Sequence, residues 1–153
     1  MTIVGQRFTY PGADVKPAAT LKLAEQYRLA AVALRTHGRR RKPLTFAPYR
    51  LVAIHAIELY LNSLLLAKGI SPATVRGMQH DFAARIDAAK NVDLKLGKGT
   101  EQHLRSLMQT REYLTARYDP EFSKASEVTR LEATLHEVAT KAAIIVNQAT
   151  LIT

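Results

Sequence analysis

Apolar residues recur at helical spacing along most of this chain of 153 residues. In the first such stretch, residues 18–37, four of them fall four, three and four positions apart and so share one side of a helix: Leu23, Tyr27, Ala30 and Leu34. Gly38 follows, and glycine is favoured at the left-handed position that ends many helices. We therefore predict a helix over 18–37, with residues 1–17 as an N-terminal arm.

The next stretch, residues 48–68, is the most apolar of the chain. Its apolar residues lie on most sides of a helix, which is typical of the central helix of a bundle. Pro48 suits the first turn of this helix and Gly69 its end. Ser71 and Pro72 then have the residue types of an N-cap and a first helical position, so we predict a further, shorter helical segment after them.

Two more long helices complete the pattern. One covers about residues 100–118 and carries its own apolar stripe, which includes Leu104 and Leu107. The last covers about residues 124–150, where apolar residues alternate steps of three and four for three heptads. No strand pattern competes with them. The sequence therefore predicts an all-α fold, an antiparallel up-and-down bundle of four long helices plus a short helix, in a single domain over 18–153.

A polar strip interrupts the apolar central helix. His55, Glu58 and Asn62 lie at steps of three and four and so follow one side of it. Burying such groups costs about 1–3 kcal/mol each unless they find hydrogen-bond partners. The strip is therefore either a satisfied buried network that fixes helix register or a site on the flank of the bundle. His55 and Glu58 alone are too few for a metal site.

Arg111 is a second polar exception on an apolar stripe. In a continuous helix it lies within about 40° of Leu104 and Leu107. An arginine in that position needs an acid, a carbonyl or a bound phosphate as its partner. Glu58 is one candidate acid, so both a structural ion pair and a ligand contact are open.

Three segments, in this order and spacing, resemble the HEPN-domain family. His55 and Glu58 precede a leucine-rich run that ends at Gly69, as in the second-helix signature of that family. The segment 79–82, with His80 and Asp81, is similar to its short His-Asp segment, and residues 117–120 are similar to the Arg-Tyr-acidic-Pro end of its third helix. The resemblance covers about residues 48–120.

The resemblance implies a four- or five-helix bundle that is usually a homodimer. One group of HEPN domains consists of metal-independent RNases, with an arginine, four to six residues and then a histidine. The other group lacks this motif and binds nucleotide or nucleic acid, often beside a small nucleotidyltransferase and in toxin–antitoxin pairs.

This chain departs from the RNase motif. Arg111 takes the place of the motif arginine, but Arg117 stands where the histidine belongs. A guanidinium stays charged near neutral pH, whereas an imidazole exchanges a proton there. The resemblance therefore points to the non-RNase, nucleotidyltransferase-associated type, although Asn62 replaces the lysine usual in that signature.

The other histidines give little support for catalysis. Arg130 and His136 also match the motif spacing, but on one straight helix their side chains diverge by about 120°. His37 and His103 are isolated, and we expect both at the surface. The chain shows no paired carboxylates of a two-metal site, so we expect no catalytic residue, metal or cofactor.

Charge is the remaining signal. The chain has 22 Lys and Arg against 13 Asp and Glu and no Cys, and residues 1–50 hold ten of the bases and two of the acids. The densest point is the run Arg39, Arg40, Arg41 and Lys42. Such asymmetry favours contact with a polyanion or an acidic partner, while a solvated loop that aids solubility is the alternative. No apolar run looks long enough for a membrane span and no signal peptide is evident, so we expect a cytoplasmic protein.

Two functions follow from these patterns. The first is a non-catalytic, HEPN-like binding module that engages nucleotide, nucleic acid or a nucleotidyltransferase-type partner through its basic first third. On this hypothesis Arg111, Arg117 and His80 line the groove of the dimer. The second is a divergent metal-independent RNase, in which Arg111 orients phosphate and His80 or His55 handles the proton. A purely structural bundle is a third possibility.

Overall fold

The computed structural model describes residues 10–121 and 125–151 of the chain. This part is all-helical and contains no strand, as predicted. It forms seven α-helices and one short 3₁₀-helix: α1 (Pro17–Arg35), η1 (Pro43–Phe46), α2 (Ala47–Ala67), α3 (Pro72–Gly77), α4 (Phe82–Lys90), α5 (Lys98–Thr110), α6 (Glu112–Tyr118) and α7 (Val128–Leu151). The predicted N-terminal arm lies mostly outside the described residues.

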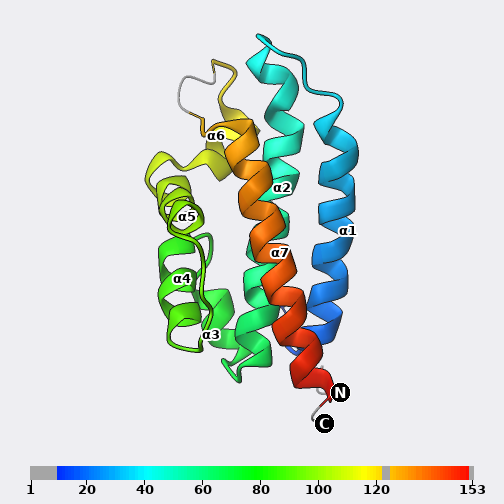
Figure 1. Ribbon diagram of the computed structural model, residues 1–153, viewed down its shortest axis with the longest axis vertical. Helices are drawn as coiled ribbons and strands as arrows, with labels where there is room; N and C mark the ends of the chain where they lie inside the picture. The colour runs from blue at the N-terminus through cyan, green and yellow to red at the C-terminus, as the bar shows by residue number, and fades with distance from the viewer. Residues whose placement is uncertain (1–9, 122–124, 152–153) are drawn as a thin grey trace, which may run out of the picture.

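Helix α2 is the centre of the molecule. It runs antiparallel to α1, and α1 and α7 lie beside it along most of its length (Figure 1). The shorter helices α4, α5 and α6 cover a further side, with α6 near the end of the bundle where α2 begins (Figure 1). The prediction of a central helix is confirmed, since α2 is buried on most sides and its largest fully buried side chains include Tyr49, Tyr60 and Leu61.

The segment Pro43–Ala67 is long and apolar enough to cross a membrane by length and composition, so the expectation that no stretch reaches that length is wrong. Its most apolar window is 61% buried inside the bundle. The other helices supply the apolar surroundings that this segment requires, as is usual for the core helix of a helical bundle.

The buried face of α1 differs from the predicted stripe. Thr20, Ala24 and Ala31 are buried, whereas Leu23 is 48% exposed. Small side chains on this face allow the backbones of α1 and α2 to approach closely, and the larger apolar residues are left beside the contact.

Gly38 does not end α1 as predicted. The C-cap of α1 is Thr36, in a right-handed conformation, and Gly38 is not among the residues with positive φ. A Cβ atom at Gly38 would lie 2.1 Å from the ring of Phe46, so close packing explains the glycine. Gly69, in contrast, has φ +88° and follows α2 as a left-handed residue, as predicted.

The predicted third helix is two helices, α5 and α6, that meet at Arg111. This residue has φ 51° and ψ 42°, a left-handed conformation that residues other than glycine seldom adopt. The helix is interrupted there, so Arg111 is exposed and the following Glu112 is fully buried. The placement of Arg111 on the stripe of Leu104 and Leu107 is therefore wrong, because helical periodicity holds only along a continuous helix.

The predicted seam of the last helix is confirmed at its centre. Residues of α7 that are buried include four of the predicted seam positions: Leu131, Leu135, Val138 and Ala142. The short predicted segment after Ser71 and Pro72 is α3, and a further helical stretch with Phe82 and Ile86, which the sequence also predicts, is α4. Ser71 caps the first of them as predicted, since its Oγ accepts a hydrogen bond of 3.2 Å from the backbone N of Thr74.

Candidate functional site

Glu58 is the centre of a polar cluster between α2 and the segment that leads into α4. Its side chain is almost buried, and three cationic or titratable groups surround it. His80 Nδ1 lies 3.0 Å from Oε1, Arg85 Nη2 3.6 Å from Oε1, and His55 Nδ1 3.6 Å from Oε2. The structure thus brings together three residues that the sequence analysis singled out, His55, Glu58 and His80.

Arg85 is the member of this cluster that the sequence analysis missed. It is 2% exposed, and its Nε donates a hydrogen bond of 2.8 Å to Asn62 Oδ1. Burial lowers the pKa of Arg85, and the Glu58 carboxylate opposes this effect. The available signal was its position between Phe82 and Ile86, since all three residues belong to the buried face of α4.

The carboxyl group of Glu58 remains ionised in this setting. Burial by itself raises its pKa, but the hydrogen bonds from His55 and His80 and the charge of Arg85 together bring the pKa below its usual value. Because an ionised carboxylate can only accept hydrogen bonds, His80 must donate through Nδ1–H. The His80 side chain is 52% exposed, so the imidazole lies at the boundary between the buried Glu58 and the solvent.

Asp81 has a structural role beside this cluster. Its Oδ1 accepts a hydrogen bond of 2.9 Å from the backbone N of Ala84 and so caps the N-terminus of α4. Arg85 Nη1 donates to the backbone O of Asp81 at 3.2 Å. The cap fixes the turn that presents His80, and Gln79 enters this turn with φ 49°.

A small pocket of about 40 Å³ opens beside Glu58. Tyr113 and Arg117 from α6 line it together with the two histidines of the cluster. The ring of Tyr113 lies 4.8 Å from that of His80, and on the other side Tyr27 meets His55 edge-on at 4.6 Å. Arg117 is exposed, and its guanidinium lies over the ring of Tyr118 at 5.3 Å.

Arg111 does not join this pocket. It is exposed at the break between α5 and α6, and Glu58 is paired with His80 and Arg85 instead. The candidate ion pair between Arg111 and Glu58 is therefore wrong, and of the two arginines proposed for phosphate binding only Arg117 lines the pocket.

The basic run forms an ordered turn between α1 and η1. Lys42 N donates to Arg39 O at 3.0 Å, and Arg41 takes a left-handed conformation with φ 66°. Thr45 Oγ1 accepts from Arg39 N at 2.7 Å and donates to Lys42 O at 2.6 Å. The side chains of residues 39–42, which we name the basic turn, are exposed, and none of them forms an ion pair with a residue that the structure describes.

Some other cations of the first third are paired within the fold, although only Arg50 is buried. Three arginines are ion-paired, namely Arg28 with Glu25, Arg35 with Glu132 and Arg50 with Glu112. Lys16 and Lys22, in contrast, are exposed and form no ion pair with a described residue. Within the described part of residues 1–50 the basic turn is the densest exposed point of positive charge, at the end of the bundle where α6 also lies (Figure 1).

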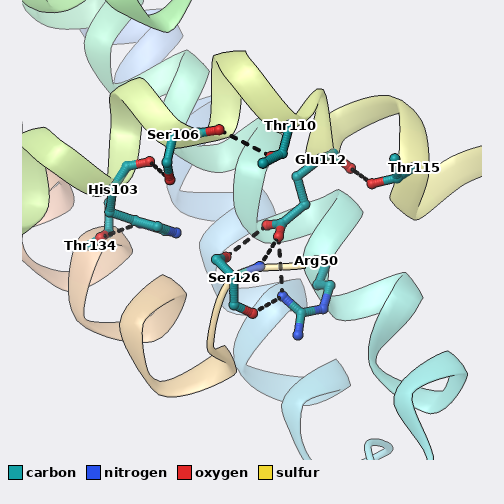
Figure 2. A network of polar contacts seen from close by, with 8 residues as sticks. All are labelled: Arg50, His103, Ser106, Thr110, Glu112, Thr115, Ser126 and Thr134. Carbon is teal, nitrogen blue, oxygen red and sulfur yellow. Dashed lines mark hydrogen bonds and ion pairs between the residues drawn. The ribbon is translucent and has the colours of Figure 1, made fainter. Parts of the chain in front are cut away.

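A second polar cluster lies inside the bundle (Figure 2). Arg50 Nη1 contacts Glu112 Oε1 at 3.5 Å and donates to Ser126 O at 2.6 Å. Glu112 in turn accepts from the backbone N and from the Oγ of Ser126, the latter at 3.0 Å. These contacts tie α2 and α6 to the segment that leads into α7, so we assign this cluster a structural role.

His103, expected at the surface, is buried beside this cluster (Figure 2). Its Nδ1 is hydrogen-bonded to Thr134 Oγ1 at 2.7 Å, and its Nε2 has no partner among the described residues. Burial, together with the charges of Arg130 and Arg50, lowers its pKa to about 4. His103 is therefore neutral at physiological pH.

The pair Arg130 and His136 diverges as predicted. Arg130 Nη2 donates to Thr100 Oγ1 of α5 at 2.9 Å, whereas His136 is exposed on another side of α7. His37 is exposed, as expected. Among the described residues no group of three His, Cys, Asp or Glu is placed to hold a metal ion.

Comparison of the chain with protein-family models, curated proteins and solved structures finds no match.

Proposed function

We propose that this protein is a non-catalytic, HEPN-like binding module that holds the phosphates of a nucleotide or of RNA at the end of the bundle carrying the basic turn. The observation that carries this proposal is the basic turn itself, in which Thr45 holds four exposed cations on an ordered backbone. As in the family that the sequence resembles, the proposal includes a homodimer, a small nucleotidyltransferase as partner and a cytoplasmic location.

The pocket beside Glu58 supplies a second phosphate contact. Its volume of about 40 Å³ is close to the share of one or two waters and too small for a nucleobase, but it suits part of a phosphate group at its rim. Arg117 adds a positive charge there, while Arg85 balances Glu58.

Contacts of this kind are electrostatic and carry little sequence information. Binding therefore weakens steeply with salt and differs little between RNA sequences. Each phosphate contact to a single strand contributes about 0.7 to the slope of log affinity against log salt. Loss of the four cations of the basic turn thus flattens this slope by up to roughly 3.

The test is an anisotropy titration with a fluorescently labelled single-stranded RNA between about 50 and 200 mM salt. We compare the unmodified chain, a variant with residues 39–42 replaced by serine, and Arg117→Gln. A matched control replaces four other exposed cations by serine: Lys68, Arg76, Lys95 and Lys98. We expect the basic-turn variant to lose affinity and salt slope and the control to keep most of both. Equal losses in the two variants would show that only net charge matters.

A metal-independent RNase is the second candidate, and a specific contact favours it. His80 donates to the buried carboxylate of Glu58, and its half-exposed ring lines a pocket that Arg117 also lines. Such an imidazole can accept and return a proton, and the arginine can stabilise phosphate charge.

The RNase candidate predicts RNA cleavage in the presence of EDTA. This activity should disappear in His80→Gln and in Arg117→Gln, while Arg111→Gln, which alters an exposed residue outside the pocket, should retain it. If the protein is a non-catalytic binding module, neither the unmodified chain nor any of the variants should cleave RNA. Cleavage with the stated pattern would replace our first proposal by the second.

A further inference from the structure

A cleft of about 360 Å³ separates α1 from α7 on a side of the bundle that the proposed phosphate contacts do not use. The two helices are close where α1 begins and α7 ends, and they diverge toward the opposite end (Figure 1). Val32 of α1 and Leu135 of α7 line the cleft from opposite sides, and Tyr49 of α2 lines it from the core. Its volume is in the range of small-molecule sites.

Tyr49 gives this cleft an unused polar group. The residue is 2% exposed, but its hydroxyl is not among the fully enclosed polar atoms of the described residues. Burial raises the pKa of this hydroxyl to about 12, so it stays protonated and can donate. Because the hydroxyl is not fully enclosed and Tyr49 lines the cleft, it can donate a hydrogen bond to an acceptor of a ligand bound there.

The charges that line the cleft are already paired. Arg35 Nε donates to Glu132 Oε2 at 3.0 Å, and Arg28 Nη2 lies 2.9 Å from Glu25 Oε2. The cleft therefore offers donors and acceptors without a strong net charge. Val32 is 57% exposed and adds an apolar wall. This combination favours a neutral, flat group that carries both donors and acceptors over a free anion.

The basic turn lies directly beyond this cleft. Thr36 lines the cleft, and Arg39 follows three residues later, a reach of at most about 10 Å along the chain. Arg35 connects the two regions, since its guanidinium lies over the rings of Phe46 and Tyr49 at 5.4 and 5.9 Å. A neutral ring in the cleft with an attached anionic group can thus reach the cations of the turn.

We propose that the cleft between α1 and α7 binds the base of a nucleotide and that the phosphate of this nucleotide lies against the basic turn. The base stacks on the apolar surface of Val32 and Leu135 and accepts a hydrogen bond from Tyr49. The phosphate contact rests on the function proposed above, whereas the base site is separate from it.

The test is calorimetric titration of the full chain with the four uncharged ribonucleosides and with their 5′-monophosphates. We expect at least one nucleoside to bind and its monophosphate to bind more tightly. Tyr49→Phe, which removes only the hydroxyl, should weaken binding of both roughly two- to tenfold. Val32→Trp, at an exposed position, should fill the cleft and abolish binding of both ligands. Tyr10→Phe removes an exposed hydroxyl elsewhere and should change nothing.

The basic-turn variant separates the two proposals. Its affinity for the monophosphate should be weaker than that of the unmodified chain, whereas its affinity for the nucleoside should be unchanged. Absence of binding by every nucleoside and monophosphate, or binding that neither Tyr49→Phe nor Val32→Trp alters, overturns the base site. RNA affinity that still depends on the basic turn would then leave the proposed function intact. Nucleoside binding without RNA binding would support the base site and contradict the proposed function.

Discussion

Arg50 Nη1 lies 3.5 Å from Glu112 Oε1 in the interior of the bundle, although the two residues are 62 positions apart. Both side chains are buried, and Glu112 is also hydrogen-bonded to Ser126 (Figure 2). The left-handed residue Arg111 makes this contact possible, because it ends α5 and turns the next residue inward. A break in a helix thus joins α2, α6 and the approach to α7.

Replacement of Glu112 by alanine removes the carboxylate from this contact. We expect the free energy of unfolding to fall by about 3–5 kcal/mol, since a buried arginine then loses the carboxylate that contacts it. Urea denaturation measures this change. Glu121→Ala, at an exposed position in the same region, is the control and should cost less than about 0.5 kcal/mol. Similar costs for both variants would contradict a stabilising role of the ion pair.

Protonation of His103 should destabilise the fold at acid pH. Its pKa is about 4 in the folded protein and near 6.5 in the unfolded chain. Between these values the unfolded state binds the proton more readily, so stability falls as the pH is lowered from about 6.5 to about 4, by an order of 3 kcal/mol. Urea denaturation at several pH values should show a shallower decline in His103→Gln than in the unmodified chain. Parallel curves would mean that His103 does not titrate in this way.

Glu58 and Arg85 should be energetically coupled. Each is nearly buried and each has the other as a charge partner, so either single alanine variant leaves a charge in a poorly solvated site. We expect each single variant to lose about 3 kcal/mol and the double variant to lose less than the sum, with a coupling energy of about 0.5–3 kcal/mol. A double-mutant cycle by urea denaturation measures this energy. Additive losses would show that the two residues act independently.

Gly38 should tolerate no larger residue without rearrangement. A Cβ atom at this position overlaps the ring of Phe46, on which the guanidinium of Arg35 is stacked. We expect Gly38→Ala to cost about 1–3 kcal/mol, as is usual for overpacking. The variant Gly38→Ala with Phe46→Leu, which removes most of the ring, should recover part of this loss. Failure of the second substitution to restore any stability would exclude the clash as the cause.

Much of the helical framework was predictable because helices depend on local spacing. The extent of α2, the cap at Ser71 and the centre of the α7 seam follow from residue types a few positions apart. Position within a helix also predicted that His55, Glu58 and Asn62 share a side. The buried Arg85 could have been found from its place on the apolar face of α4, but a charged residue there is rarely interpreted as a core residue.

The errors arose where the backbone departs from helical periodicity or where a distant segment approaches. Helical periodicity places Arg111 on the apolar stripe, because nothing in its neighbours reveals the left-handed break. An isolated His103 suggests a surface residue, because its burial depends on Thr134 of another helix. Gly38 suggests a left-handed helix end, whereas close packing against the ring of Phe46 explains this glycine.

The sequence by itself therefore determined an all-α chain with a central apolar helix, a basic turn after the first helix and a set of polar residues in need of partners. Tertiary structure alone decided which partners those residues have. Glu58 pairs with His80 and Arg85, Arg117 reaches the pocket while Arg111 does not, and Tyr49 lines a cleft. The physical reason is that helix formation is governed by neighbours along the chain, whereas charge pairing and burial are governed by neighbours in space.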